Sequence, residues 1–300
     1  MKRLITSTIF IMLFVSIGAV QPYYKIGHSN KSVPELTAEV TKLLLGHEFE
    51  VLGMYHPNRD NNLCVIVFSC DELTSMATAV TDKGAFGSTL KIGLIREGDR
   101  TEITMLNPYY IKHAYFNESA NRHEAIKMTA MTDSLVKEAL SPLAVDSKYY
   151  GRDIPEEELN EYHFMPTMPR YKNVIELNEY DEFLEAVATI KSNLLKGTGD
   201  CELVYELLFE DKEIAVLGVA FHGKDNPERE MLELMGAGCI SSLPIEILVQ
   251  GHKAYILNGR FRIPLFKSDL SILKIFKVVG ISSDINSCAK KIAEWDVVND

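Results

Sequence analysis

The chain carries an internal repeat, which limits its fold to two similar halves. The stretch Ser88–Gly98, read STLKIGLIREG, recurs 153 positions later as Ser241–Gly251, read SSLPIEILVQG. Each copy is followed by a second strand-like run that reaches an asparagine, Asn107 in one half and Asn258 in the other. Two strand-like runs joined at a glycine-containing turn indicate a β-hairpin. The repeat therefore predicts a duplicated domain.

The elements expected around the two hairpins follow the same order in both halves. A capping box at Ser32 and Glu35 opens the first helix, and Pro227 is a favoured first residue for the last one. Each half is expected to read helix, two strands, helix, two strands, with strands at 49–55, 63–69, 89–96 and 101–106, and at 202–209, 214–221, 243–249 and 253–258. Paired hairpins with helices on one face form a two-layer sandwich. The predicted class is α+β, with two tandem sandwiches packed as a pseudo-dimer.

The rest of the chain lies outside the two repeats. The expected boundaries are an N-terminal segment at 1–20, a first repeat at 21–111, a connector at 112–172, a second repeat at 173–265 and C-terminal helices at 266–300. Apolar spacing predicts a helix over 118–140, whereas the prolines further along the connector favour an extended strap. The tail is expected to hold a strand-like run at 260–265 and helices at 269–279 and 284–295.

The first twenty residues have the pattern of a secretory signal peptide. Lys2 and Arg3 precede an apolar run, Leu4–Val20, that ends in small residues around Ala19. The run has 17 residues and contains several hydroxyl side chains, whereas a spanning helix needs about 20 apolar residues. We expect cleavage near residues 20–22 and export to the periplasm or the medium, with an uncleaved membrane anchor as the alternative.

The charge of the chain argues against partners with negative surfaces. The sequence has 31 Lys and Arg against 42 Asp and Glu, a formal net charge of −11. Loss of Lys2 and Arg3 with a signal peptide would leave 29 against 42, or −13. Nucleic-acid binding depends on clustered basic residues that replace the counterions of phosphates. We therefore expect no nucleic-acid partner, no docking on anionic lipid, and no membrane insertion after signal cleavage.

The second half resembles a known family. The run Val216–Ala220, then a helix, then Leu243–Val249 and a glycine-centred turn are similar to the bacterial domain-of-unknown-function family 302. The resemblance covers about residues 32–111 and 175–265. It implies a small two-layer α/β fold that associates in pairs, so two copies in one chain could face each other with a groove between them. It implies no established activity.

The chain departs from the cysteine pattern of that family. The family places an Ala-Cys-Asn-Pro run after the second strand, where this chain has Ser69-Cys70-Asp71 in one half and Ala220-Phe221-His222 in the other. The family also places Pro-Cys before the third strand, and here only Pro244 remains, followed by Ile245. A thiol role carried over from the family would therefore rest on Cys70 alone.

Four residues are candidates for recognition or chemistry. Arg260 and Arg262 alternate in Arg-Phe-Arg-Ile, so on a strand both guanidiniums would share one face and could clamp a carboxylate or phosphate. Solvated side chains or ion pairs with nearby glutamates are the alternative. Glu246 points opposite to its isoleucine neighbours on the expected strand, which favours an exposed or interface-rim carboxylate over a perturbed acid. Cys70 is the candidate thiol.

Metal and cofactor chemistry find no support in the sequence. The cysteines at 64, 70, 201, 239 and 288 are odd in number and lack Cys-x-x-Cys spacing, which favours buried thiols with at least one unbridged. Cys64 and Cys70 stand six positions apart along an expected strand, which separates their thiols too far for a disulfide. The glycine-rich stretches 84–89 and 236–241 lead into strands, so they are expected to be turns and not phosphate loops. We expect no metal and no cofactor.

Two hypotheses about function remain open. The first is an exported, non-enzymatic binding protein that holds a small molecule or an envelope protein between its two similar domains. The second is an exported thiol-dependent or acid–base enzyme that uses Cys70 or Glu246 with Arg260 and Arg262. An exposed Cys70 beside a cationic or histidine side chain would favour the second, because a reactive thiolate needs that environment.

Overall fold

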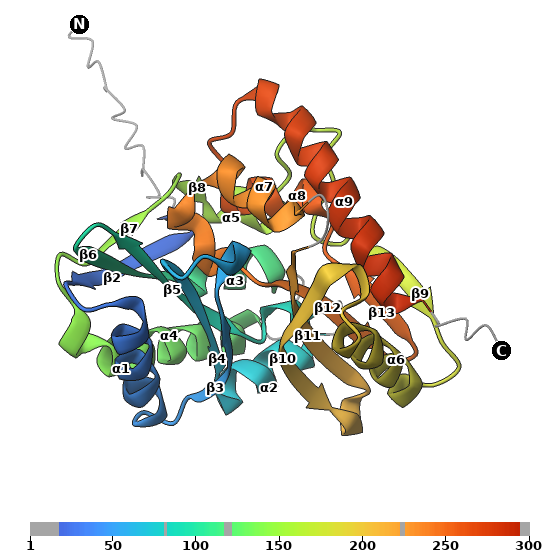
Figure 1. Ribbon diagram of the computed structural model, residues 1–300, viewed down its shortest axis with the longest axis horizontal. Helices are drawn as coiled ribbons and strands as arrows, with labels where there is room; N and C mark the ends of the chain where they lie inside the picture. Colours follow the sequence, from blue (N-terminus) through green and yellow to red (C-terminus); the bar gives the residue numbers. More distant parts are fainter. Residues whose placement is uncertain (1–17, 81–82, 117–121, 223–225, 295–300) are drawn as a thin grey trace, which may run out of the picture.

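Two antiparallel β-sheets pack against each other at the centre of the molecule (Figure 1). The computed structural model describes residues 18–80, 83–116, 122–222 and 226–294. The six-stranded sheet has the order β3-β4-β5-β6-β2-β7, formed by Glu50–Tyr55, Leu63–Ser69, Leu90–Glu97, Arg100–Leu106, Tyr23–Ser29 and Lys148–Tyr150. The five-stranded sheet has the order β10-β11-β12-β13-β9, formed by Cys201–Phe209, Ile214–Phe221, Ile245–Gln250, Lys253–Ile256 and Ile175–Glu179.

The two sheets share one strand order over five strands. β3, β4, β5, β6 and β2 occupy the places that β10, β11, β12, β13 and β9 occupy in the other sheet. The α+β fold class is confirmed, with strands and helices interspersed in both halves. The duplication itself stays a prediction, since common origin requires Cα traces that superpose, with Leu90 on Leu243 and Ile92 on Ile245.

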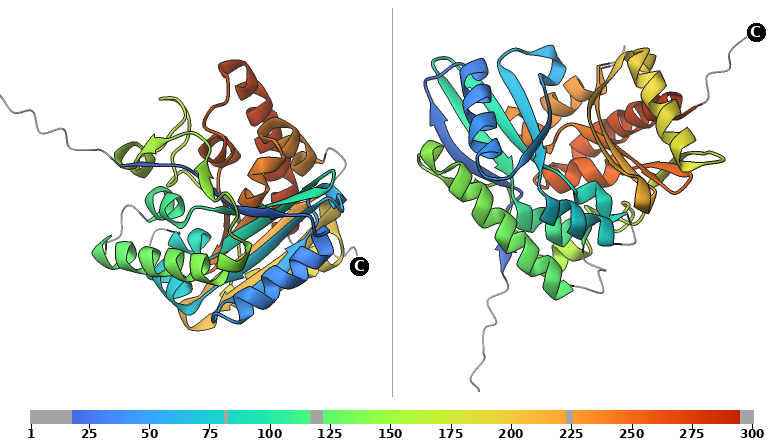
Figure 2. Two further views of the ribbon diagram at one scale, coloured as in Figure 1. Left: turned by 90° about the vertical axis from the view of Figure 1, so that its left-hand side faces the viewer. Right: turned by 90° about the horizontal axis from the view of Figure 1, so that it is seen from below.

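Helices cover the outer faces of both sheets, so the layers run helix, sheet, sheet, helix. α1 (Val33–Leu45) and α4 (Arg122–Ala139) pack on the six-stranded sheet, and α6 (Phe183–Leu195) and α9 (Ile275–Ala293) pack on the five-stranded sheet. Figure 2 (right) shows α1 and α6 on opposite outer sides with the sheets between them. The other helices are α2 (Asp71–Ala79), α3 (Pro108–Tyr115), α5 (Glu156–Asn160), α7 (Pro227–Met235) and α8 (Gly259–Phe266).

Short 3-10 turns carry the contact between the halves. η2 (Gly84–Gly87) precedes β5 and packs on β11 and β12, while η6 (Ala237–Ser242) precedes β12 and packs on β5 and β6. Each half thus inserts its glycine-rich turn onto the inner face of the other sheet. The remaining 3-10 turns are η1 (Pro57–Arg59), η3 (Ser141–Leu143), η4 (Thr198–Asp200), η5 (Glu210–Lys212) and η7 (Ile272–Lys274), and a short ladder joins β1 (Ala19–Val20) to β8 (Ile154–Pro155).

Several local signals in the sequence give the expected structures. The backbone N–H of Ser32 donates to the Glu35 carboxylate at 2.8 Å, which completes the start of α1. Gly98 and Gly251 have φ of 58° and 57° in the turns of the two hairpins, a conformation that favours glycine. α7 begins at Pro227 as predicted, and α2 begins at Asp71.

Other predictions are wrong, and local chemistry explains them. Residues 260–265 form part of helix α8 and not a strand, because the Asn258 side chain accepts from the backbone N–H of Arg260 at 3.0 Å and caps a helix. Asn107 caps α3 in the same way through Tyr109 at 3.1 Å. The two helices expected at 269–279 and 284–295 are one continuous α9, with residues 295–300 outside the described part.

Each sheet also contains a strand that the sequence did not indicate. β2 and β9 precede the first helix of their halves, so the observed unit is strand, helix, two strands, helix, two strands. The connector contributes β7, the sixth strand of the first sheet, beside β2. Seven polar or glycine residues among the twelve of these two strands obscure the apolar alternation that marks a strand.

The edge strands β3 and β10 come so close that one position requires glycine. A Cβ atom built on Gly53 would overlap the backbone carbonyl oxygen of Val204. We expect Gly53→Ala to lower the free energy of unfolding by about 1–3 kcal/mol, because backbone atoms must move apart to admit the methyl group. Gly280→Ala is the matched control, since nothing lies within 4 Å of its Cβ position on α9. It should stabilise the protein by about 0.5–1 kcal/mol, and urea unfolding would measure both.

Candidate functional site

The two candidate arginines do not form a clamp. Arg260 and Arg262 lie on α8, and residues two apart on a helix do not face each other. Arg262 is buried, whereas Arg260 is half-buried and points elsewhere on the helix. The prediction of a shared strand face is therefore wrong, because the Asn258 cap turns the chain into a helix at this point.

Glu246 lies in the interior, so the expectation of an exposed or rim carboxylate is wrong. It sits on β12 opposite Gly218 of β11 and faces the first half of the chain. Its carboxylate forms an ion pair with Lys91 of β5 and lies 3.6 Å from the Arg262 guanidinium. We call Lys91, Glu246 and Arg262 the central ion cluster. Its members come from both sheets and from α8.

The central ion cluster is closed to solvent. The side chains of Lys91, Glu246 and Arg262 are only 6%, 3% and 3% exposed, respectively. Burial lowers the pKa of Lys91, and the attraction of Glu246 opposes that shift. The Arg262 guanidinium also donates to the backbone carbonyls of Ser242 and, at 3.0 Å, Pro244. The cluster bridges the two sheets, and a ligand could reach it only if the sheets separated.

A second polar cluster joins the halves at Glu228. This residue lies in the first turn of α7 and is 1% exposed. Its carboxylate accepts from the Tyr55 hydroxyl at 3.2 Å and from the backbone N–H of Asn58 at 2.7 Å, both in the first half of the chain. Burial raises the pKa of Glu228 to about 7. Sequence reasoning missed this acid, although the Asn-Pro-Glu start of a helix is a signal that could have drawn attention to it.

Further charged groups lie beside Glu228. The His222 ring nitrogen is 3.5 Å from the Glu202 carboxylate, and Arg59 contacts Asp200 at 2.8 Å across the two halves. Burial lowers the pKa of His222, and the nearby Arg59 charge acts in the same direction. His222 directly follows the end of β11.

Cys70 lies apart from the other three candidates. It follows β4 and belongs to the core between the six-stranded sheet and helices α1 and α4, whereas the central ion cluster lies between the sheets. Burial raises the pKa of the Cys70 thiol, and the neighbouring Glu72 acts in the same direction. A reactive thiolate needs a cationic neighbour that lowers its pKa. The structure therefore brings Glu246 and Arg262 together and leaves Cys70 and Arg260 elsewhere.

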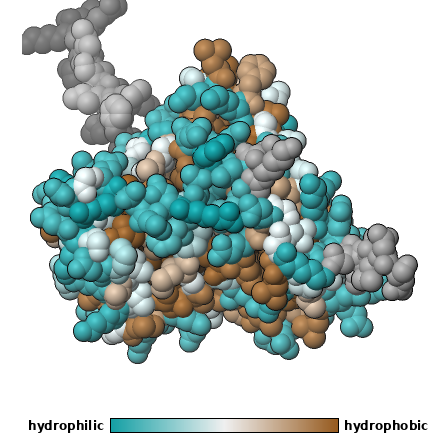
Figure 3. Space-filling view, in the orientation of Figure 1, coloured by the Kyte–Doolittle hydropathy of each residue, from teal (hydrophilic) through white to brown (hydrophobic). Residues whose placement is uncertain are grey.

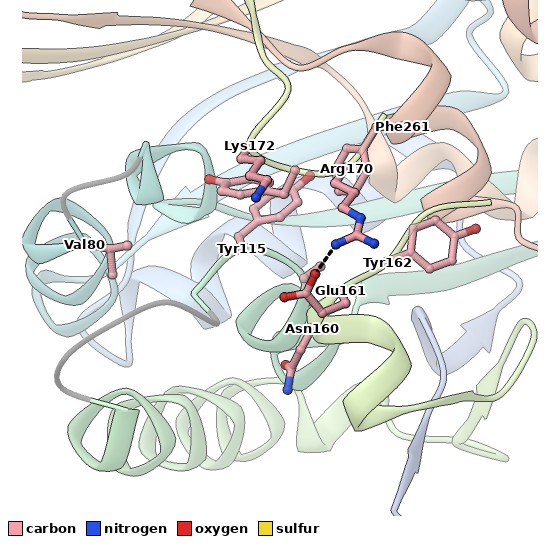
Figure 4. Close-up of a pocket in the computed structure, with 10 residues that line it drawn as sticks. Val80, Tyr115, Asn160, Glu161, Tyr162, Arg170, Lys172 and Phe261 are labelled. Atoms are coloured by element: carbon pink, nitrogen blue, oxygen red, sulfur yellow. Dashed lines mark hydrogen bonds and ion pairs between the residues drawn. The ribbon is translucent and has the colours of Figure 1, made fainter. Parts of the chain in front are cut away.

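An aromatic pocket lies where the connector meets α3 and α8. Figure 4 shows Tyr115, Tyr162 and Phe261 around it, with Arg170 directed at Glu161 at 2.5 Å. The cavity measures about 30 Å³, which is room for one or two water molecules. It is too small for a metabolite. Among the described residues, no three His, Cys, Asp or Glu side chains gather in a way that could hold a metal ion.

Two larger hollows lie on the outer flanks. The α1 groove has a volume of about 670 Å³ and the α6 groove about 620 Å³, both within the range of ligand sites. The α1 groove is lined by Pro34, Thr37, Ala38, Thr41, Lys42 and Leu45 of α1 with Met54, His56 and Cys64. The α6 groove is lined by Leu184, Val187, Ala188, Lys191, Ser192 and Leu195 of α6 with Lys196, Glu206 and Leu208.

The helix positions that line the two grooves are equivalent. Every one of the six α6 residues stands 150 positions after one of the six α1 residues. Leu45 and Leu195 end the two stripes and are 59% and 80% exposed. Met54 and Leu208 supply exposed apolar side chains from the edge strands β3 and β10. Figure 3 shows hydrophobic surface in the lower part of the molecule, where these elements lie.

Comparisons with known proteins do not place the chain in a family. No family model matches it, and no curated protein matches it. Within the described ranges, none of the helices combines the length and the apolar character needed to cross a bilayer.

Proposed function

We propose that the protein is an exported, non-enzymatic binding protein that holds apolar segments of a partner protein in the α1 groove and the α6 groove. The observation that carries the proposal is the equivalence of the two grooves, whose helix linings match position by position. Exposed apolar surface of this kind typically marks interaction sites.

The shape of the grooves favours a polypeptide over a small molecule. Each stripe runs along its helix over twelve residues, or about 17 Å, which suits a short helix or extended segment. The lining is apolar with a few charged groups, Lys42 in one groove and Lys191, Lys196 and Glu206 in the other, where Lys191 pairs with Glu206 at 2.6 Å. A mainly apolar segment would match it.

The space between the sheets is a less suitable place for a ligand. The central ion cluster fills its middle, and η2 and η6 cover the inner faces of the sheets. The outer grooves therefore replace the inter-domain groove implied by the resemblance to family 302. Two divergent copies of that family fold remain our proposal for the origin of the halves, supported by their shared strand order.

Export is part of the proposal and rests on the sequence. Lys2, Arg3 and the apolar run after them fall in residues 1–17 for the most part, outside the described residues. The alternative function, an enzyme using Cys70 or Glu246 with Arg260 and Arg262, gains no support from their placement. Glu246 and Arg262 meet only in a buried cluster closed to solvent, and Cys70 and Arg260 lie elsewhere.

Site-specific photo-crosslinking in the native host tests the proposal. A benzophenone amino acid placed at Met54 or Leu208 should capture the same protein, because the two grooves are equivalent. Leu273 on η7 is the matched control, since it is 83% exposed and lies in neither groove. Leu45→Glu and Leu195→Glu should each reduce capture from their own groove at least about tenfold, since they replace a leucine contact with a charge. The proposal would be contradicted if the crosslinker at Leu273 captured the same protein. It would also be contradicted if the crosslinkers in the two grooves captured no protein.

A further inference from the structure

The end of α9 is fixed beside the start of β10. The Asn193 side chain of α6 donates to the backbone carbonyls of Ile292 and Glu294, both at 2.8 Å. The Tyr180 hydroxyl donates to the carbonyl of Ala293 at 2.5 Å. η4, which leads directly into β10, packs against the same helix. These contacts hold the side chains of α9 in a set position over the first residue of β10.

Two cysteines meet at this place. Cys201 is the first residue of β10 and is 4% exposed, and Cys288 lies half-buried on α9. The Cys201 thiol donates to the carbonyl of Gly199 in η4, which packs on α9, at 3.6 Å, and the nearby Cys288 thiol together with burial raises the pKa of Cys201. Cys64 and Cys70 belong to the other core, and the Cys239 thiol donates to the carbonyl of Met235 at 3.4 Å. Cys201 and Cys288 are thus distinguished from the other three by facing each other.

We infer that Cys201 and Cys288 are a disulfide-forming pair that covalently ties the C-terminal helix α9 to the five-stranded sheet when the protein meets a disulfide oxidant. The thiol-to-disulfide change removes two electrons and two protons from the pair. A small disulfide such as oxidised glutathione supplies the acceptor. The bridge would use two of the five cysteines and leave three as thiols.

The exposure of the two thiols determines which of them reacts first in thiol–disulfide exchange with glutathione. The half-buried Cys288 thiolate attacks one sulfur of oxidised glutathione, which forms a mixed disulfide and releases one reduced glutathione. The Cys201 thiolate then attacks the Cys288 sulfur of that mixed disulfide. The second glutathione leaves with its sulfur reduced, and each protein proton ends on a glutathione thiol. Cys201 needs no direct access to the oxidant.

Peptide mapping of the full chain tests the inference. Reduced protein would be treated with oxidised glutathione at pH 8, alkylated in denaturant and digested with trypsin without reduction. The expected product joins the peptides Gly197–Lys212 and Val278–Lys290, and the thiol count falls from five to three. Closing a loop of about 87 residues should raise the melting temperature by roughly 4–12 °C over the reduced protein.

Variants of single cysteines separate this pairing from the others. Cys288→Ser and Cys201→Ser should each abolish the joined peptide and the thermal shift, whereas Cys239→Ser should keep both. Stable glutathione adducts without a joined peptide would overturn the inference. A bridge that involves Cys64, Cys70 or Cys239, or five thiols that persist under these conditions, would do the same. Partner binding in the grooves plays no part in this measurement.

Discussion

Replacing Glu246 by alanine is expected to lower the free energy of unfolding by about 3–5 kcal/mol, because two buried cations lose their shared counter-ion. Lys91 and Arg262 are almost fully enclosed, so water cannot replace the carboxylate in the folded state. The cost reflects the isolated charges left behind and not the net worth of the intact pairs. Urea unfolding at pH 7, followed by circular dichroism, would measure it.

Two further variants give this experiment its controls. The triple replacement Lys91→Met, Glu246→Leu and Arg262→Met removes all three charges and should recover most of the loss, because a well-packed apolar set needs no counter-ion. Glu206→Ala removes the partner of Lys191 on the surface, where the side chains are 23% and 36% exposed. It should cost less than about 1 kcal/mol. An equally small loss for Glu246→Ala would show that the cluster does not hold the sheets together.

The central ion cluster also makes the two halves unequal. In the hairpin alignment, Gly93 stands where the second half has Glu246, and Pro244 stands where the first half has Lys91. Gly93 cannot carry a side chain without displacing Ile240 of η6. The interface between the two halves therefore contains one Lys-Glu-Arg set, whereas two identical halves would contribute two such sets related by symmetry. We expect this asymmetry to favour pairing of the two halves within one chain over pairing of identical halves from different chains.

The sequence predicts the fold where local signals are strong. The hairpin turns at Gly98 and Gly251 and the capping box at Ser32 and Glu35 depend only on residues close in the chain, and all of them form as expected. The same holds for the start of α7 at Pro227. Each of these structures is set by the backbone preferences and hydrogen bonds of neighbouring residues, which a single sequence displays.

The sequence does not predict contacts between residues distant in the chain. Nothing in the run around Glu246 shows that Lys91, 155 positions earlier, supplies its partner, so an exposed carboxylate is the natural expectation. The alternation of Arg260 and Arg262 suggests a strand, but the Asn258 cap decides for a helix. The central ion cluster therefore depends on how the two sheets pack against each other. The only hint of that packing in the sequence is the repeat, which suggests that two similar halves face each other.

A strong pH dependence of stability is expected from Glu228. Its pKa is about 7 in the folded protein, against about 4.3 in an unfolded chain. Between these values the folded state keeps the proton and the unfolded state has released it, so the free energy of unfolding falls as the pH rises. The stabilisation is fully present below the unfolded pKa and is lost as the pH passes about 7. The total change attributable to this group is about 3–4 kcal/mol.

The variant Glu228→Gln should remove that dependence, because a neutral amide can still accept from the Asn58 backbone N–H and donate to the Tyr55 hydroxyl. We expect it to exceed the wild type by about 1 kcal/mol at pH 5 and by about 3–4 kcal/mol at pH 8, because the unfolded chain begins to release its proton near pH 4.3. Glu230→Gln, exposed on the same helix, is the control and should follow the wild type at both pH values. Urea unfolding at a series of pH values would show the difference. If both variants kept the wild-type slope, Glu228 would be ionised throughout, and the buried contact between the halves would have to tolerate a full negative charge.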